Sequence, residues 1–180
     1  MFEINWRITD AASEITCMES EDVDRANVEG FFQLNFNGRT YGYHHGNVLG
    51  EGETGAELVT FWFHLLLISV MELVNSDYVA FCDPESPTWI EFTVRNELVY
   101  VNFRERRRPP IGTSSPMVVS TQWDDFDSKT DPQGTVITLD ELKNTLQTEV
   151  KKYVSALVNA NRAFKDSRAL IELSSMARKL

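Results

Sequence analysis

Residues 57–75 are the most apolar stretch of this 180-residue chain, and they limit its fold more than any other feature. If successive residues are placed about 100° apart, as in an α-helix, the polar ones fall on one narrow stripe: Glu57, Thr60, His64, Glu72 and Asn75. Only Ser69 lies off that stripe. Such a helix must be covered on most sides, so we expect it at the centre of the fold. A membrane span is not predicted, because the apolar stretch is shorter than ~20 residues and contains Glu72.

The segment that follows predicts a β-hairpin. Residues 75–77 favour a turn, and residues 78–82 begin a β-rich run. Residues 89–94 and 98–103 each alternate apolar with polar side chains, with Arg95-Asn96-Glu97 between them. We expect one face of this hairpin to be buried against the helix, through Ile90, Phe92, Val94, Val99, Val101 and Phe103.

Both ends of the chain also carry clear patterns. Residues 2–8 alternate as a strand, with Phe2, Ile4, Trp6 and Ile8 on one face, and residues 31–36 and 39–43 flank Asn37-Gly38, a strong signal for a two-residue hairpin turn. Thr138 and Glu141 form a capping box that begins a long amphipathic helix. Its apolar stripe is Leu139, Leu142, Leu146, Val150, Tyr153, Val154, Leu157 and Val158. Asn159-Ala160-Asn161 weakens that helix, and a short one follows from about Ser167.

These elements predict an α+β fold: an antiparallel sheet of hairpins packed on a buried central helix, with a long amphipathic C-terminal helix. The length and the 42% of hydrophobic residues suit one compact core, so residues 1–180 are expected to form a single domain. Cys17 and Cys82 have no metal-ligand spacing and are expected to be free, buried thiols. Residues 1–6 lack the basic and apolar regions of a signal peptide, so the expected location is the cytoplasm.

The net charge of −10 opposes a general affinity for nucleic acid. It favours either solubility alone or a basic protein partner. The only basic cluster is residues 104–108. It could bind phosphates, but in a chain this acidic we expect its arginines to pair with nearby carboxylates.

Two acidic segments are candidate partner-binding sites. The first contains Glu19, Glu21, Asp22 and Asp24, and its weak periodicity predicts a loop or exposed turn. In the second, Trp123 would anchor a partner while Asp124, Asp125 and Asp127 attract a basic surface. Each has a simpler interpretation: the first as a solvated face, the second with its aromatic residues in the core. The second segment lacks the glycine and the closing glutamate of a calcium loop.

A glycine-rich loop at residues 44–55 is where catalytic chemistry would lie if the protein were an enzyme. Its side chains His44, His45, Glu51 and Glu53 could supply a general base or metal ligands. Adjacent histidines on an extended strand point to opposite sides, however, and neither metal-ligand nor phosphate-loop spacing is present. We therefore expect no cofactor, no metal and no enzyme activity. A small enzyme or ligand-binding domain with a pocket at the His44–Glu53 loop is the alternative. His64 is expected to be structural.

The order of elements, together with the phrase Tyr78-Val79-Ala80-Phe81-Cys82-Asp83-Pro84-Glu85-Ser86-Pro87, resembles small acidic immunity proteins of bacterial polymorphic or contact-dependent toxin systems. The resemblance implies a cytoplasmic, non-catalytic protein that binds one cognate toxin domain, often a basic nuclease, and blocks its active site. It carries no binding residues over to this chain, because such families differ most where they bind.

Overall fold

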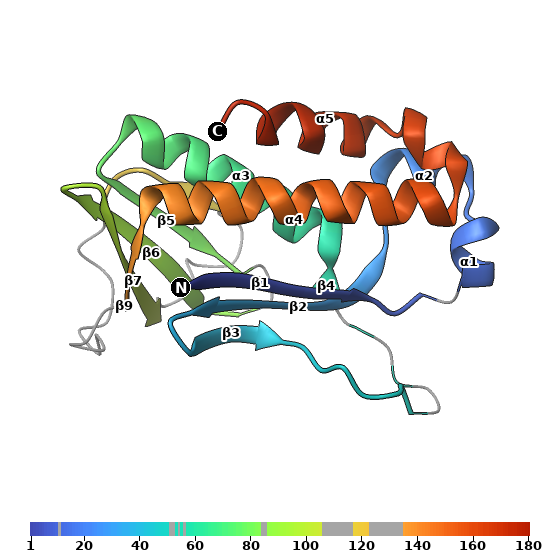
Figure 1. Ribbon diagram of the computed structural model, residues 1–180, viewed down its shortest axis with the longest axis horizontal. Helices are drawn as coiled ribbons and strands as arrows, with labels where there is room; N and C mark the ends of the chain where they lie inside the picture. The colour runs from blue at the N-terminus through green and yellow to red at the C-terminus, as the bar shows by residue number, and fades with distance from the viewer. Residues whose placement is uncertain are drawn as a thin grey trace, which may run out of the picture.

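Three helices form a layer against two antiparallel sheets (Figure 1). This computed structural model describes residues 1–10, 12–50, 53, 55, 57–83, 86–105, 117–122 and 135–180. The helices α3 (Val59–Asn75), α4 (Leu139–Ala160) and α5 (Arg168–Ala177) pack on one another. The predicted α+β class is therefore confirmed, with two sheets in place of one.

The first sheet contains the N-terminal strands. Its order is β1 (Phe2–Ile8), β2 (Glu29–Phe36) and β3 (Arg39–Tyr43), and the short β4 (Glu57–Leu58) also pairs with β2. Asn37 and Gly38 have φ angles of 53° and 88°, which the two-residue turn of a twisted hairpin requires. The predicted turn is confirmed.

The second sheet has the order β8-β5-β6-β7-β9. Its strands are β5 (Tyr78–Cys82), β6 (Thr88–Arg95), β7 (Leu98–Glu105), β8 (Val118–Val119) and β9 (Thr135–Thr138). Ile90, Phe92, Val99 and Val101 are fully buried, as the alternation predicted. Strand β9, which the sequence patterns did not indicate, pairs with β7 and leads directly into α4.

The central helix α3 contributes to the packing of both sheets. Trp62 stacks on Phe32 of the first sheet, and Val79 and Phe81 of β5 belong to the same buried cluster as the helix. The helix begins at Val59 and not at Glu57 as predicted, because Glu57 and Leu58 pair with β2 instead. Among the described residues, no helix is both long and apolar enough to cross a membrane.

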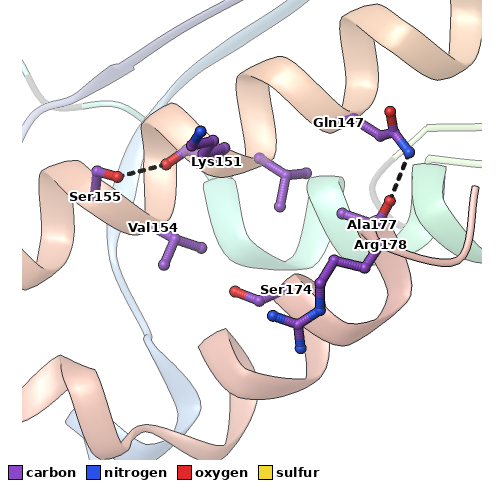
Figure 2. Close-up of a pocket in the computed structure, with 8 residues that line it drawn as sticks. Gln147, Lys151, Val154, Ser155, Ser174, Ala177 and Arg178 are labelled. Atoms are coloured by element: carbon purple, nitrogen blue, oxygen red, sulfur yellow. Dashed lines mark hydrogen bonds between the residues drawn. The ribbon is translucent and has the colours of Figure 1, made fainter.

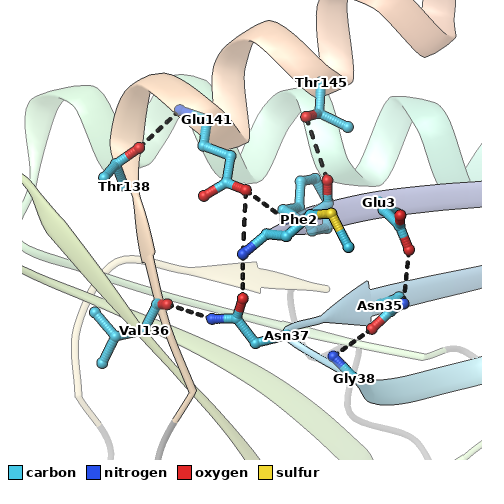
Figure 3. Close-up of polar contacts among 10 residues, drawn as sticks. Phe2, Glu3, Asn35, Asn37, Gly38, Val136, Thr138, Glu141 and Thr145 are labelled. Carbon is cyan, nitrogen blue, oxygen red and sulfur yellow. Dashed lines mark hydrogen bonds and ion pairs between the residues drawn. The ribbon is translucent and has the colours of Figure 1, made fainter.

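The long helix α4 is tied to the start of the chain. Its predicted stripe is confirmed, with Leu142, Leu146, Val150, Tyr153 and Leu157 buried. The Thr138 hydroxyl accepts a hydrogen bond from the Glu141 amide at 3.1 Å, which is one half of the capping box. The Glu141 carboxylate, however, accepts a hydrogen bond from the Phe2 amide at 2.6 Å and forms an ion pair with the N-terminal amine (Figure 3). Glu141 therefore joins β1 to α4.

The acidic segment after β1 is helical, so the predicted loop is wrong. It forms α1 (Ala12–Thr16) and α2 (Ser20–Arg25). Each helix buries one apolar side chain, Ile15 in α1 and Val23 in α2. Two helices this short show no lasting 3.6-residue period, because a single buried residue fixes each of them. Neither Cys17 nor Cys82 forms a disulfide. Cys82 is half-buried, whereas Cys17, just after α1, is exposed, so the expected burial is wrong for Cys17.

The two sheets meet through aromatic side chains. Phe36 of β2 contacts Phe92 and Phe103 of the second sheet, with ring centroids 6.1 Å apart in each case. Tyr41 of β3 stacks on Phe103, and its hydroxyl donates to the Asp83 carboxylate at 2.6 Å. Burial and this hydrogen bond raise the pKa of Tyr41. One buried cluster includes side chains of both sheets and of α3, α4 and α5.

Candidate partner-binding surface

Charge is distributed unevenly along the chain. Residues 1–138 contain 22 of the 27 acidic residues and nine of the 17 Lys and Arg, whereas residues 139–180 contain five acidic and eight basic residues. The excess negative charge therefore lies outside the segment that forms α4 and α5. Such an uneven distribution of charge can give a protein a negatively charged region that attracts a basic partner.

Helix α2 carries the four acidic residues predicted as the first candidate site. Glu19 is the N-cap of α2 and is exposed, and Glu21 is also exposed. Asp22 and Asp24 are partly buried. The helix lies at the end of the molecule where α4 ends, away from the second sheet (Figure 1). The structure thus places these residues on one short helix and leaves Glu19 and Glu21 open to solvent.

Asp24 has a structural role that the sequence did not indicate. Its carboxylate accepts a hydrogen bond from the Arg168 amide at 2.9 Å and lies 3.3 Å from the Arg168 guanidinium. Its carbonyl oxygen accepts a hydrogen bond from the Ser167 hydroxyl at 3.0 Å. Asp24 therefore fastens α2 to the start of α5.

The other three carboxylates differ in their partners. Glu21 pairs with Arg25 one turn along α2, at 2.8 Å, and both side chains are exposed. In the part of the chain that the structure describes, no ion pair involves Glu19 or Asp22. Glu19 and Asp22 are consequently the two predicted residues whose charge is most available to a partner.

A hollow of about 390 Å³ lies beside α2. It is lined by residues of α2, of the 3₁₀ helix η1 (Arg162–Asp166) and by Ser167. Its lining combines two carboxylates, two hydroxyls and three apolar side chains: Asp24, Asp166, Ser20, Ser167, Met18, Val23 and Ala163. Asp166 was missed by sequence reasoning, since no spacing indicates that residue 166 lies near residue 24. This composition suits a long basic side chain, whose stem is apolar and whose tip is charged.

The second predicted acidic segment lies outside the described residues. This applies to Trp123, Asp124, Asp125 and Asp127 alike, and also to Glu51 of the glycine-rich loop and to Arg106, Arg107 and Arg108 of the basic cluster. Their predicted roles stay predictions.

The histidine loop, the alternative site, does bring a histidine and a carboxylate together. His45 Nε2 and Glu53 Oε1 are 2.8 Å apart, and Glu53 Oε2 accepts a hydrogen bond from the Gly50 amide at 2.8 Å. That amide contact is the largest cause that lowers the pKa of Glu53. The His45 ring also packs on Phe31, with centroids 4.8 Å apart. These contacts join His45, Gly50 and Glu53 and pack the His45 ring on Phe31 of β2.

Arg7 fixes the same loop from β1. Its guanidinium donates to the carbonyl oxygens of His45 and Asn47, at 3.3 Å and 2.5 Å. Desolvation and, secondarily, the charges of His45 and Arg7 lower the pKa of His44. Within the described ranges, no group of three potential metal-ligating side chains occurs. The geometry accounts for His45 and Glu53 as loop-packing residues.

His64, expected to be structural, lies on α3 with its ring nitrogen 3.5 Å from the Glu172 carboxylate of α5. Both side chains are partly exposed. This contact joins two helices of the same layer.

A buried ion pair in the second sheet was also missed. Glu91 is only 1% exposed, and its carboxylate accepts hydrogen bonds from Arg104 Nε at 2.5 Å and from the Tyr78 hydroxyl at 2.9 Å. Burial and the Glu91 carboxylate raise the pKa of Tyr78. Arg104 thus pairs with a carboxylate, as predicted for the basic cluster, but the alternation of β6 had suggested that Glu91 faces solvent.

Comparison with known proteins gives no relative. No family model matches the chain, and no curated protein or solved structure matches it.

Proposed function

We propose that this protein binds a basic partner protein, of the kind represented by bacterial toxin domains, and neutralises it by covering its functional surface. The observation that carries the proposal is the hollow beside α2, in which Asp24 and Asp166 line a space next to Met18 and Val23. A Lys or Arg of the partner would lay its stem on the apolar side chains and place its charge at the carboxylates.

Glu19 and Asp22 would act over a longer distance. Because neither forms an ion pair with a described residue, their charge adds to the negative field outside the hollow. Such a field accelerates the encounter with a basic surface and loses strength as salt is added. The proposed mechanism is therefore steering by α2, insertion of a basic side chain into the hollow, and occlusion of the partner.

The first experiment is capture of the partner by the tagged protein at low and at high ionic strength, with mass spectrometry of what is retained. The proposal expects one stoichiometric basic protein whose toxic or enzymatic activity is blocked when it is bound. Failure to retain any basic protein at low ionic strength would reject the function.

The second experiment locates the site with that partner. Glu19→Lys/Asp22→Lys should slow association by about tenfold or more at low salt, whereas Glu72→Lys, which reverses an exposed charge on α3, should change it far less. Asp24 is avoided because it holds α5. If association instead slows only in Asp124→Lys/Asp125→Lys/Asp127→Lys, the second acidic segment is the binding site and α2 is not.

A further inference from the structure

A second hollow lies between α4 and α5, which belong to the segment with more basic than acidic residues. It measures about 580 Å³. Its apolar residues are Val150, Val154 and Ala177, and its polar residues are Gln147, Lys151, Ser155, Ser174 and Arg178 (Figure 2). Val150 and Ala177 are buried, so they form a floor, while Lys151 and Arg178 are exposed at the rim. We name this feature the α4–α5 groove.

The charges of the groove are all positive. Among the described residues that line it, Lys151 and Arg178 are the charged ones, and none has a carboxylate. Neither cation forms an ion pair within the described part of the chain, although the protein has 27 acidic residues. The neighbouring Lys152, in contrast, pairs with Glu149 at 2.7 Å. Two cations are therefore left to face the same hollow without a described counter-charge.

Hydrogen bonds hold the groove in shape. Gln147 Nε2 donates to the Ala177 carbonyl oxygen at 2.9 Å, which joins α4 to the end of α5 (Figure 2). The Ser155 hydroxyl donates to the Lys151 carbonyl oxygen at 2.8 Å, so its oxygen can still accept. In Figure 2 the Arg178 side chain runs along α5, and its guanidinium lies near Ser174. The groove is thus formed before any ligand arrives.

We propose that the α4–α5 groove binds a small organic phosphate. Its volume lies within the range of small-molecule sites, which combine an apolar lining with a few convergent polar groups. The Arg178 guanidinium matches the geometry of a phosphate group, and Lys151 adds a second positive charge. Val150, Val154 and Ala177 would contact the organic part of the ligand. This site is independent of the acidic surface at α2, and its ligand has the opposite charge to the proposed protein partner.

The probe for this site is adenosine monophosphate, which joins a phosphate to a flat apolar body. Calorimetric titration of the full chain should show saturable binding, and amide signals of residues 147–155 and 174–178 should shift in a ¹⁵N spectrum. Adenosine, which lacks the phosphate, and inorganic phosphate, which lacks the organic part, should each bind at least about tenfold more weakly.

The sequence offers a matched pair of variants. Lys151→Gln/Arg178→Gln removes both cations of the groove and should weaken binding by at least about tenfold, the size expected for a lost charged hydrogen bond. Lys152→Gln/Lys179→Gln removes the same charge from the two adjacent residues, which do not line the groove, and should leave affinity within about twofold. All four side chains are exposed, and thermal unfolding of both variants checks that the fold is intact.

Three results would overturn the proposal. If adenosine monophosphate shows no saturable binding, the proposed site does not exist. Equal weakening in the two double variants shows a general charge effect, and adenosine or inorganic phosphate binding as tightly as the monophosphate excludes recognition of an organic phosphate.

Discussion

Gly55 lies directly against the backbone of Gly30, so closely that a Cβ atom at position 55 would be 2.1 Å from the Gly30 carbonyl carbon. The Gly55 amide donates to the Thr9 hydroxyl at 2.8 Å, which ties the end of the glycine-rich loop to the first sheet. This contact sets the point at which the chain returns from the loop to β4 and α3. Position 55 therefore has no room for a side chain.

We therefore expect Gly55→Ala to destabilise the protein by about 1–3 kcal/mol, the usual cost of forcing an extra carbon into a filled site. Gly46→Ala is the matched control, because a Cβ there would meet nothing within 4 Å. Its effect should be within about 0.5 kcal/mol. Denaturant unfolding of both variants tests this, and equal stabilities would show that the Gly30 contact is not tight.

The turn between β6 and β7 carries strain that the turn of the first hairpin avoids. Glu97 has a φ of 66°, where the first hairpin has Gly38. A side chain in this left-handed region costs about 1–2 kcal/mol, and glycine removes that cost but adds entropy to the unfolded chain. Glu97→Gly should therefore raise the free energy of unfolding by about 0.5–1 kcal/mol.

Glu97→Ala separates the backbone effect from loss of the carboxylate. Alanine has the same conformational restriction as glutamate, so this variant should gain little stability. The Glu97 carbonyl oxygen accepts a hydrogen bond from the Leu139 amide at 3.0 Å, which either substitution can retain. A larger gain in the alanine variant than in the glycine variant would contradict the strain argument.

The sequence predicted those features that depend on neighbouring residues. The turn at Asn37-Gly38, the Thr138 cap and the stripe of α4 are set within a few residues of chain, so local patterns were sufficient. Other features depend on distant partners. Helix α3 begins late because Glu57 pairs with Gly30 of β2, and Glu91 can be buried because Arg104 of β7 donates a hydrogen bond to its carboxylate.

The same distinction applies to the candidate surface. The sequence identified four acidic residues at α2 but could not rank them, because their roles depend on contacts with the far end of the chain. Asp24 forms an ion pair with Arg168, and Asp166 contributes to the lining of the hollow. Only the folded structure shows that Asp24 has a different role, holding α5, from Glu19 and Asp22.

The buried pair in the second sheet predicts a large cost for the loss of one partner. Arg104→Met would leave the Glu91 carboxylate, 1% exposed, without its cation. We expect a loss of about 3 kcal/mol, since an uncompensated buried charge is strongly unfavourable. Arg25→Met is the control: it breaks the exposed pair with Glu21 and should cost less than about 0.5 kcal/mol.

A second substitution tests whether the buried charge is the cause. Glu91→Gln in the Arg104→Met background removes the charge and keeps an oxygen that can accept from the Tyr78 hydroxyl. It should recover at least half of the lost stability in denaturant unfolding. No recovery would mean that Arg104 stabilises the sheet through packing of its stem.

The lowered pKa of His44 predicts a loss of stability at mildly acidic pH. Desolvation, followed by the charges of His45 and Arg7, disfavours the protonated ring in the folded protein. Below the ordinary pKa of about 6.5 the unfolded chain therefore binds more protons than the folded one, and stability falls as the pH falls. His44→Gln removes the ionisable ring and with it this contribution to the pH dependence of stability. Because the side chain is partly exposed, we expect the wild-type protein to lose only slightly more stability than the variant between pH 7.5 and pH 5.5. Denaturant unfolding at the two pH values measures the difference, and identical losses in both proteins would show that protonation of His44 is not coupled to folding.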